Sequence, residues 1–502
     1  MPVISSPYRV GPAGAPLGRV EVLAFALAVM VCRLFAIYSF HIYDDAFITF
    51  RYAQNLAAGN GLVFNPGAPW EPVLGTTTPG YALVLSLPCR LGLPVIQSAL
   101  TLNILCDGIS ALLLMQLLRA RPIAAILAAL AFAVIPEIGR ISVGGMEPPL
   151  FAVLALGAVA ALETRRFQLA GWLAALDCTV RPEAVMLVAI LAVMYLRSWR
   201  EIVSFAIPVA VVGLIATVGL SWIYGQPIPQ SVRAKAGGHG LGPHLSRVAA
   251  ILAQGLGPSL AMRAAVPVAG LGFALAFLWR TPARAFIAFG LAIVSAYCAV
   301  GVKTWGWYFF VPLTAWCAAL GIGVDATAEF LARAKPAWRM ERPSTGASLA
   351  LAASVVVTVA LFARAYPDRV TPHVYGAMRE WIAKEHIQRD KPTILASDIG
   401  AIGFFSDTQI LDSEGLVWPE ARKFGWQLDV IKVHRPDYLM LVVTSYRLEP
   451  FINDPIAALY EPLARFTTTD DERLAPDVAS LPFWWEQDYI VYRRRDYAKR
   501  TE

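Results

Sequence analysis

The sequence predicts an α-helical membrane protein that crosses the bilayer many times and carries a small C-terminal α/β domain. Three observations lead to this prediction. The chain of 502 residues is 57% hydrophobic and only 16% charged, with a mean hydropathy of +0.56, whereas soluble proteins have about 25% charged residues. The apolar residues gather in long runs, and from about residue 366 the composition becomes that of a soluble domain.

About eleven apolar runs approach the length of about 20 residues that a helix needs to cross a bilayer. They are predicted as spans at about 20–40, 95–118, 122–139, 147–163, 167–181, 183–198, 201–223, 262–279, 284–302, 305–329 and 346–365. The run at 79–93 is too short to cross, so we predict an interfacial or re-entrant helix there.

The basic residues predict the orientation. Lys and Arg fall mainly in short loops between the apolar runs, which places those loops and the N-terminus in the cytoplasm. The net charge of +6 therefore does not indicate a nucleic-acid partner. The N-terminal run has no convincing cleavage site, so it is interpreted as a retained first helix. These features predict a multi-pass protein of the inner membrane.

The predicted organisation has two parts. Residues 1–366 form the transmembrane domain, within which 41–94 is the first extracytoplasmic loop with its interfacial helices. Residues 367–502 form an α/β domain in the periplasm or outside the cell, because strand-like runs such as YLMLVV alternate there with helix-like segments. Gly400 and Gly403 follow a predicted strand without a full phosphate-loop pattern, which favours a tight turn.

An acid pair follows the first apolar run. Asp44 and Asp45 lie within a few residues of the point where that run leaves the bilayer. Carboxylates at this depth are costly unless they serve a cavity or a partner. One of them can act as a general base, taking a proton from an attacking hydroxyl, while the other orients a substrate or binds metal. The alternative is that the pair caps the helix that follows it.

Three further charged residues interrupt apolar sequence. Glu147 opens a predicted span, where it either faces the site or is stabilised by the helix dipole. Arg181 and Glu183 separate two apolar runs, and they either bind substrate or pair with each other. All three are candidates for substrate binding.

Basic and aromatic residues complete the candidate set. Arg233, Lys235 and Lys303 are candidates for contacts to a phosphate, which Arg and Lys bind readily. Tyr308, in the aromatic segment after Lys303, and Arg51, in the helix after the acid pair, are added as substrate-binding candidates. The neighbouring tryptophans, Trp305 and Trp307, are typical of an interfacial aromatic belt.

Six segments carry a resemblance to a known family. The chain resembles a bacterial family of membrane glycosyltransferases of the GT-C superfamily, similar to the mycobacterial terminal arabinofuranosyltransferases and, more distantly, to the lipid A aminoarabinose transferase. The segments occur in the same order: DDAFITFRYAQNLAAGNGLVFNPG, TTTPGY, GGMEPPLF, TVRPEAV, YGQPIPQSVRAK and SDIGAIGFFSDTQILDSEGL. The resemblance covers nearly the whole chain.

The resemblance implies a polyprenyl-phosphate-linked sugar donor and an inverting transfer at the outer face of the membrane. The acceptor would be a hydroxyl of a cell-envelope glycan, lipid or protein. The family's catalytic aspartate matches Asp44 or Asp45, and analogy favours Asp44 as the base. The chain departs from the usual pattern around Glu71 and at Gln230 and Ser231, which bears on the specificity for sugar or acceptor.

No cofactor or metal-ligand set is predicted, although a divalent cation (Mg, Mn or Ca) beside the acid pair is compatible with the residues. Two other functions fit the same sequence. A lipid-linked glycan flippase or transporter would also hold charges in a membrane cavity, and a non-catalytic envelope scaffold would also have an external domain. All three proteins would contact membrane lipids, and none would bind nucleic acid.

Overall fold

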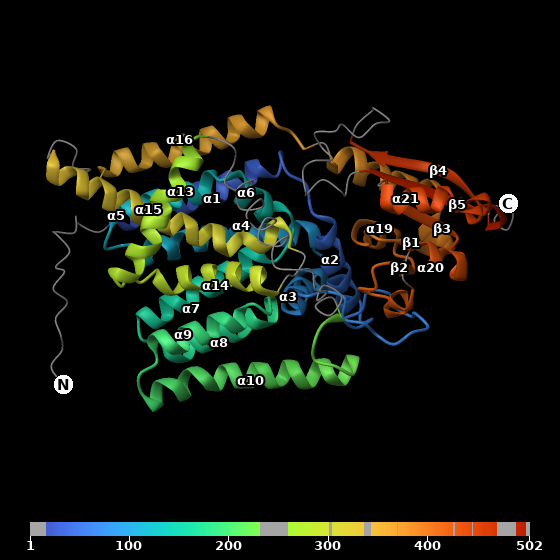
Figure 1. Cartoon of the computed structure of the whole chain (residues 1–502), viewed down its shortest axis with the longest axis horizontal. Helices are drawn as coiled ribbons and strands as arrows, with labels where there is room; N and C mark the ends of the chain where they lie inside the picture. The colour runs from blue at the N-terminus through green and yellow to red at the C-terminus, as the bar shows by residue number, and fades with distance from the viewer. Residues whose placement is uncertain are drawn as a thin grey trace.

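A computed structural model describes residues 17–230, 260–300, 304–335, 343–368, 370–424, 427–443, 445–468 and 488–497. Helices fill one end of the elongated molecule and a five-stranded sheet occupies the other (Figure 1). The first polar segment of the chain, which contains the acid pair, lies between these two ends.

Each predicted run coincides with a helix or a pair of helices. Their bounds are α1 Arg19–Ala36, α4 Val95–Leu117, α5 Pro122–Val134, α6 Pro136–Val143, α7 Pro148–Glu163, α8 Phe167–Val180, α9 Ala184–Tyr195, α10 Trp199–Tyr224, α13 Leu260–Leu278, α14 Arg284–Val300, α15 Phe310–Ala334 and α16 Thr345–Ala365. Among the described residues, four helices are long and apolar enough to cross a membrane, or five if one bent pair counts as a single span. The other apolar helices are shorter.

The bent pair corrects one prediction. The run at 122–139 was expected to be one continuous span, but α5 and α6 meet at an angle of 61°. Ile135 between them is extended and Pro136 begins the next helix. Proline cannot donate a helical hydrogen bond, and it disfavours the helical conformation in the residue before it.

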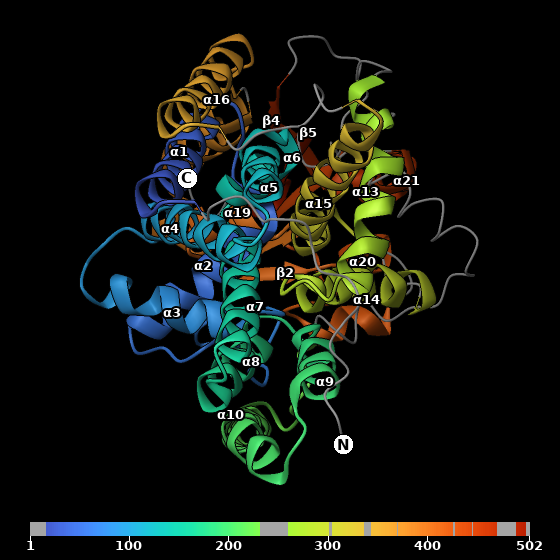
Figure 2. The same cartoon turned by 90° about the vertical axis from the view of Figure 1, so that its left-hand side faces the viewer.

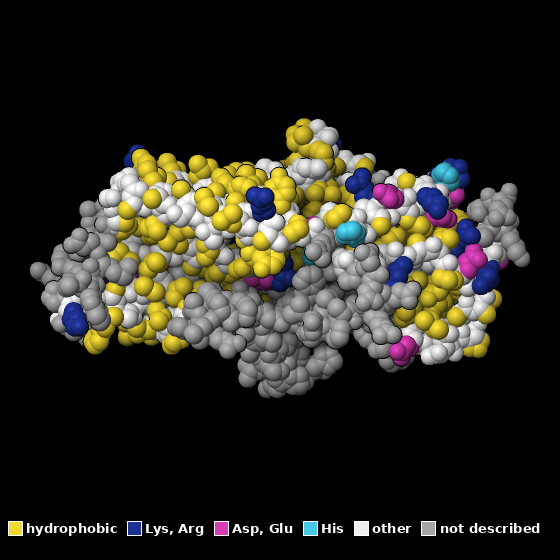
Figure 3. Space-filling model, turned by 90° about the horizontal axis from the view of Figure 1, so that it is seen from above, with side chains coloured by type: hydrophobic (Ala, Val, Ile, Leu, Met, Phe, Trp, Pro, Cys, Tyr) yellow, Lys and Arg dark blue, Asp and Glu magenta, His cyan; other side chains and the backbone are white. Residues whose placement is uncertain are grey.

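Two peripheral helices explain why the protein lies in a membrane. In the most apolar stretch of α10 only 11% of the residues are buried within the protein, and in α16 only 17%. These helices lie at opposite edges of the bundle (Figure 2). The surface over the helical end is mostly hydrophobic, whereas most charged side chains in view lie toward the sheet end (Figure 3). Such an extensive apolar surface requires lipid around it.

The segment after α1 forms two short helices, α2 Asp44–Ala57 and α3 Pro79–Arg90. Twelve residues of α-helix extend about 18 Å, too short for the hydrocarbon core of about 30 Å. Leu83, Leu87 and Leu91 follow one another at a spacing of four residues and are all at least half exposed. This geometry agrees with the interfacial helix expected at 79–93.

The C-terminal sheet has the strand order β2–β1–β3–β5–β4. Its strands are β1 Ile394–Ala396, β2 Ile410–Asp412, β3 Tyr438–Val442, β4 Tyr460–Thr467 and β5 Asp488–Arg494. The first three strands pair in parallel, and β5 runs antiparallel to both β3 and β4. The connecting helices are α17 Ala377–Lys384, α18 Ile387–Asp390, α19 Gly400–Ser406, α20 Gln427–His434 and α21 Ser445–Ile452.

Both faces of the three parallel strands are buried, as their apolar side chains require, whereas the edge strand β4 is partly exposed. Successive side chains of a strand point to opposite faces. In β3, Met440 belongs to the large core that continues into the helical part, whereas Leu439 and Leu441 belong to a second core with Val430 and Ile431 of α20. The first face therefore joins the sheet to the rest of the molecule.

Candidate active site

Asp44 binds the main chain of the C-terminal domain. Its Oδ2 accepts a hydrogen bond from the Gly400 N–H at 2.8 Å, and its Oδ1 accepts one from the Ala401 N–H at 2.7 Å. These amides begin α19, so Asp44 caps that helix from 356 residues away in the sequence. The helix that Asp44 itself begins, α2, has Tyr43 at its N-cap position and no side-chain cap. The alternative that the pair caps the helix following it is therefore wrong for Asp44, which caps α19 instead.

Gly400 and Gly403 permit this close approach. A Cβ atom on Gly400 would overlap the main-chain oxygen of Asp44. A Cβ on Gly403 would lie 2.6 Å from Phe64 Cζ and 2.8 Å from Arg51 Nη1. Both glycines lie within α19 and neither has a positive φ angle. The tight-turn interpretation is thus wrong. Glycine is required at these positions because a larger side chain would collide with residues of the first loop.

Arg51, further along α2, also binds the C-terminal domain. Its guanidinium donates to the main-chain oxygen of Gly403 and, at 2.6 Å, to that of Thr408. The Cζ atom also lies 4.4 Å from the centre of the Phe64 ring. Arg51 was predicted to bind substrate, but these contacts join the first loop to the C-terminal domain.

Other side chains of the first loop extend this interface. Asn65 exchanges two hydrogen bonds with the backbone of Ile410 in β2, at 3.0 and 3.1 Å, as a neighbouring strand would. Phe47 packs against Phe404, Phe405 and Tyr375, with ring centres 5.2 to 5.3 Å apart. The acid pair therefore lies at the interface between the first loop and the C-terminal domain. We call the contact between α2 and α19 the α2–α19 seam.

The two acids differ in environment. Asp44 is only 3% exposed, whereas Asp45 is half-buried. Burial and, to a smaller extent, the negative charge of Asp398 together raise the pKa of Asp44 to about 7, against the lowering effect of the two amide donors. A buried carboxylate is harder to ionise because the charged form loses its water.

Asp398 was not singled out by sequence reasoning. It follows β1 within SDIGAIG, two residues before Gly400, and its Oδ2 accepts a hydrogen bond from Tyr489 OH at 3.3 Å. The feature of the sequence that could have drawn attention to Asp398 is an acid just after a buried strand. Its effect on Asp44 could not be predicted, because that effect depends on how the two domains pack.

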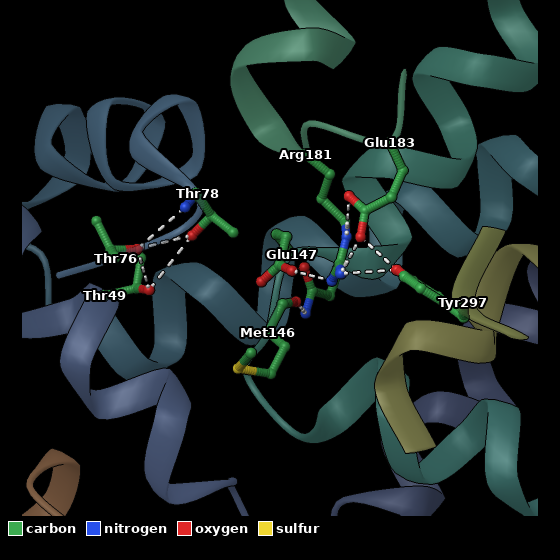
Figure 4. A network of polar contacts seen from close by, with 9 residues as sticks. Thr49, Thr76, Thr78, Met146, Glu147, Arg181, Glu183 and Tyr297 are labelled. Atoms are coloured by element: carbon green, nitrogen blue, oxygen red, sulfur yellow. Dashed lines mark hydrogen bonds and ion pairs between the residues drawn. The ribbon is translucent and has the colours of Figure 1, made fainter. Parts of the chain in front are cut away.

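A second polar network lies among the helices (Figure 4). Arg181 Nη1 donates to Glu147 Oε1 at 2.6 Å, and its Nη2 donates to Glu183 Oε1 at 2.8 Å. Tyr297 of α14 donates to Glu183 as well. The pairing of Arg181 with Glu183 that the sequence left open is present, and Glu147 joins it. Arg181 is 6% exposed and Glu147 is 1% exposed.

Aromatic rings pack against this network and the acid pair. Tyr308 lies with its ring centre 4.6 Å from Arg181 Cζ, an arrangement in which the ring face attracts the cation. Trp307 is only 5% exposed and packs on Tyr43, with ring centres 4.8 Å apart. The expected interfacial position of Trp307 is therefore wrong, because it packs beside the residue that precedes the acid pair.

Three buried threonines lie at the start of α3 and in α2. The hydroxyl oxygen of Thr76 is 3.2 Å from that of Thr49 and 3.0 Å from that of Thr78. In Figure 4, Glu147 lies between this cluster and Arg181. The cluster fixes the TTTPG segment to α2.

Two buried acids within the spans were also missed. Asp107 of α4 accepts a hydrogen bond from Arg33 Nε of α1 at 2.6 Å and another from Ser142 at 2.6 Å, which joins three helices. Asp177 of α8 is fully buried, and no residue in the described part of the chain forms a hydrogen bond to its side chain. Each was visible as an acid inside an apolar run.

Arg233, Lys235 and Lys303 lie outside the described residues, so their predicted phosphate contacts stay predictions. No group of three or more His, Cys, Asp or Glu side chains within the described ranges is arranged to hold a metal ion.

Comparisons with known proteins give the fold. A family model described as a domain of unknown function, DUF8728, matches residues 364–492. The curated protein sequences give no match. Among solved structures, ArnT from Cupriavidus metallidurans in the apo state is similar at 14% identity, covering 95% of this chain and 98% of that one, with a TM-score of 0.58.

ArnT bound to undecaprenyl phosphate gives 13% identity, the same coverages and a TM-score of 0.55. The arabinofuranosyltransferase AftD from Mycobacteria gives 16% identity over 96% of this chain and 40% of that one, at a TM-score of 0.47. The likeness to ArnT extends over nearly the full length of both chains. The fold that the sequence resemblance implied is confirmed by it.

Proposed function

We propose that this membrane protein with the GT-C fold is an inverting glycosyltransferase. It takes a sugar from a polyprenyl-phosphate carrier and transfers it to a hydroxyl of a cell-envelope glycan, lipid or protein at the outer face of the inner membrane. The observation that carries the proposal is the acid pair at the start of α2, in which one carboxylate is held by backbone amides and its neighbour is half-buried. The shared fold with ArnT, whose structure was solved with undecaprenyl phosphate, supports the choice of donor.

We assign the base to Asp45 instead of Asp44, which analogy had favoured. Both oxygens of Asp44 already accept hydrogen bonds, and the side chain is 3% exposed. Asp45 is the more accessible of the two. It takes the proton of the acceptor hydroxyl as the hydroxyl oxygen attacks the anomeric carbon of the donor sugar.

The bond between the anomeric carbon and the phosphate oxygen breaks as the new glycosidic bond forms on the opposite face of the sugar. The lipid phosphate leaves as a stable anion, so the reaction requires no general acid. One base is therefore sufficient, whereas glycoside hydrolysis uses two carboxyl groups. We propose a mechanism without a resident metal, which predicts that transfer continues after treatment with EDTA.

The remaining candidates divide into two groups. Arg233, Lys235 and Lys303 are proposed to stabilise the charge that develops on the departing phosphate, as preorganised cations do. Arg181 already binds Glu147 and Glu183 and lies against the Tyr308 ring. We therefore propose that these four residues shape the wall of the donor site, with Glu147 between Arg181 and the threonine cluster (Figure 4).

The proposed placement follows from the basic loops. The eleven apolar runs cross the inner membrane, and the loop 41–94 and the domain at 367–502 face the periplasm or exterior. The hydrophobic exteriors of α10 and α16 support the membrane location. The C-terminal domain is proposed to contact the acceptor.

The test is sugar transfer by the purified full chain in nanodiscs, from a panel of polyprenyl-phosphate sugars to a cell-envelope extract. Asp45→Asn should lower the rate by about 10²- to 10⁴-fold, the usual contribution of a general base, with unchanged monodispersity. Asp390→Asn is the matched control, because Asp390 is paired with its exposed neighbour Arg389.

An Asp45→Asn variant that keeps the wild-type rate would contradict the assigned base. If the wild type transfers no sugar from any donor, the same nanodisc protein is placed in proteoliposomes with labelled lipid-linked sugar. Movement of that lipid between leaflets without transfer would favour the transporter, and inactivity in both assays would favour the scaffold.

A further inference from the structure

We infer that the C-terminal domain is a positioning part of the catalytic site: the amides at the start of α19 hold Asp44 and thereby fix the direction in which Asp45 points. Gly400 is the positioning residue that makes this contact possible. The inference rests on the proposed function and deepens it. It gives the domain of unknown function a role in catalysis that differs from recognition of the acceptor.

The first step is the geometry of adjacent residues. Consecutive residues on an α-helix are separated by about 100° around its axis, since a turn takes 3.6 residues. Once the Asp44 carboxylate is bound to the amides of Gly400 and Ala401, rotation of the first turn of α2 is prevented. The side chain of Asp45 then leaves the helix in one fixed direction, about 100° around the helix axis from that of Asp44.

The second step is that α2 is held at two places. Asp44 and Arg51 are seven residues apart, close to two full turns, so they lie on one face of α2. Both bind the backbone of the same domain, Asp44 at the beginning of α19 and Arg51 at Gly403 and Thr408. Phe47, one turn after Asp44, packs between them on Phe404 and Phe405. Two attachments on one face fix both the rotation and the axial position of the helix.

The third step is the chemistry. A general base must reach the hydroxyl within about 2.6–3.2 Å. A misplacement of about 1 Å in a reacting group can cost about 10²-fold in rate. A change at α19 should therefore slow the chemical step, because it turns Asp45 away.

Gly400→Ala tests the inference from the C-terminal domain. The new methyl group would overlap the main chain of Asp44 and move α2 away from α19. We expect kcat to fall about 10²-fold, with the KM values for donor and acceptor within about twofold of wild type. The matched control is Gly376→Ala in the same domain, where the nearest atom to the added Cβ is the Thr371 main-chain oxygen at an ordinary 3.5 Å.

Two further readouts separate positioning from loss of folding. Gly403→Ala meets only the far ends of the Phe64 and Arg51 side chains, so it should lower kcat less than Gly400→Ala does. Hydrogen exchange should increase across residues 44–57 in Gly400→Ala and stay at the wild-type rate in Gly376→Ala. The Asp44→Asn side chain keeps one of the two oxygens that accept hydrogen bonds from the Gly400 and Ala401 amides. We therefore expect its kcat to lie between those of the wild type and Gly400→Ala.

Three outcomes would overturn the inference: wild-type kcat in Gly400→Ala, an increase confined to the acceptor KM, or equal kcat losses in Gly400→Ala and Gly376→Ala. The second outcome would make the domain an acceptor-binding module. If Gly400→Ala does not fold, the kcat values of Gly403→Ala and Asp44→Asn decide. Absence of transfer by the wild type contradicts the proposed function itself and is thus distinct from these results.

Discussion

Two regions of the molecule hold buried charges in different ways. At the α2–α19 seam, Asp44 and Arg51 form hydrogen bonds with backbone groups of a domain more than 350 residues away. In the helical network, Arg181 is satisfied by the side chains of Glu147 and Glu183. Both regions are charged and buried, but in the second a cation is paired directly with two carboxylates, whereas in the first Asp44 and Arg51 bind backbone groups.

The difference shows which partner each region depends on. Removing the cation from between two carboxylates leaves both of their buried charges uncompensated. A carboxylate bound to amides depends on the position of a helix. The helical network should therefore respond most to changes of charge, and the seam should respond most to changes of shape.

The largest effect is expected for Arg181→Ala. It would leave Glu147 and Glu183 buried together without a cation, at a cost of about 3–5 kcal/mol in the free energy of unfolding. Thermal unfolding in detergent would measure it. The control is Arg165→Ala, because Arg165 is 75% exposed in its pair with Glu201, and exposed pairs contribute about 0–1 kcal/mol. Equal losses in both variants would refute the contrast between buried and exposed pairs.

A smaller effect is expected for Asp44→Ala. The variant loses both hydrogen bonds to the start of α19, and removal of an N-terminal cap costs about 0.5–2 kcal/mol. The apparent melting temperature should decrease accordingly, and proteolysis should become faster at 397–408. If the melting temperature matched that of Asp390→Ala, the seam would not depend on Asp44.

Asn65→Ala should cost about 1 kcal/mol. The two hydrogen bonds between the Asn65 amide and Ile410 would be lost, and a typical hydrogen bond contributes about 0.5–1.5 kcal/mol. The seam would remain attached through Asp44 and Arg51, so kcat should be nearly unchanged while stability decreases. A large loss of kcat would show that β2 also positions the acid pair.

The last prediction concerns how stability changes with pH. The pKa of Asp44 is raised to about 7 by burial and by Asp398, against about 4 in an unfolded chain. Between these pH values the folded protein holds a proton that the unfolded chain releases, so the contribution of Asp44 to stability decreases as the pH rises from about 4 to 7. Asp398→Asn should move this decrease to lower pH, measured by melting temperature at half-unit steps.

Asp44→Asn is the control for this measurement, since it should remove the Asp44 contribution from the same window. A decrease that keeps its position in Asp398→Asn would mean that Asp398 does not act on Asp44. The other buried acids contribute equally to wild type and variants and therefore cancel in the comparison.

Much of the fold could be predicted from apolar runs, because lipid imposes length and hydropathy on each helix. The break at Pro136 could have been predicted too, since proline interrupts a helix wherever it occurs within one. Within the site, the Arg181–Glu183 pair was predictable because its members are two residues apart.

The role of Asp44 could not be predicted, since it depends on how α19 packs on α2 across 356 residues. A capping acid was expected from its position before a helical segment, but sequence alone cannot say which helix it caps. The same limitation applies to Gly400 and Gly403: a turn and a close approach both require glycine, and only packing distinguishes them.

The seam also has a consequence for biosynthesis. The ribosome makes Asp44 first and the amides of Gly400 and Ala401 356 residues later. At about 5–20 residues per second, roughly 20 to 70 s separate the two. During this interval α2 lacks its partner helix, and Asp44 lacks the amides that hold it. Premature termination between residues 366 and 399, after α16 and before α19, would therefore leave the acid pair without its anchor.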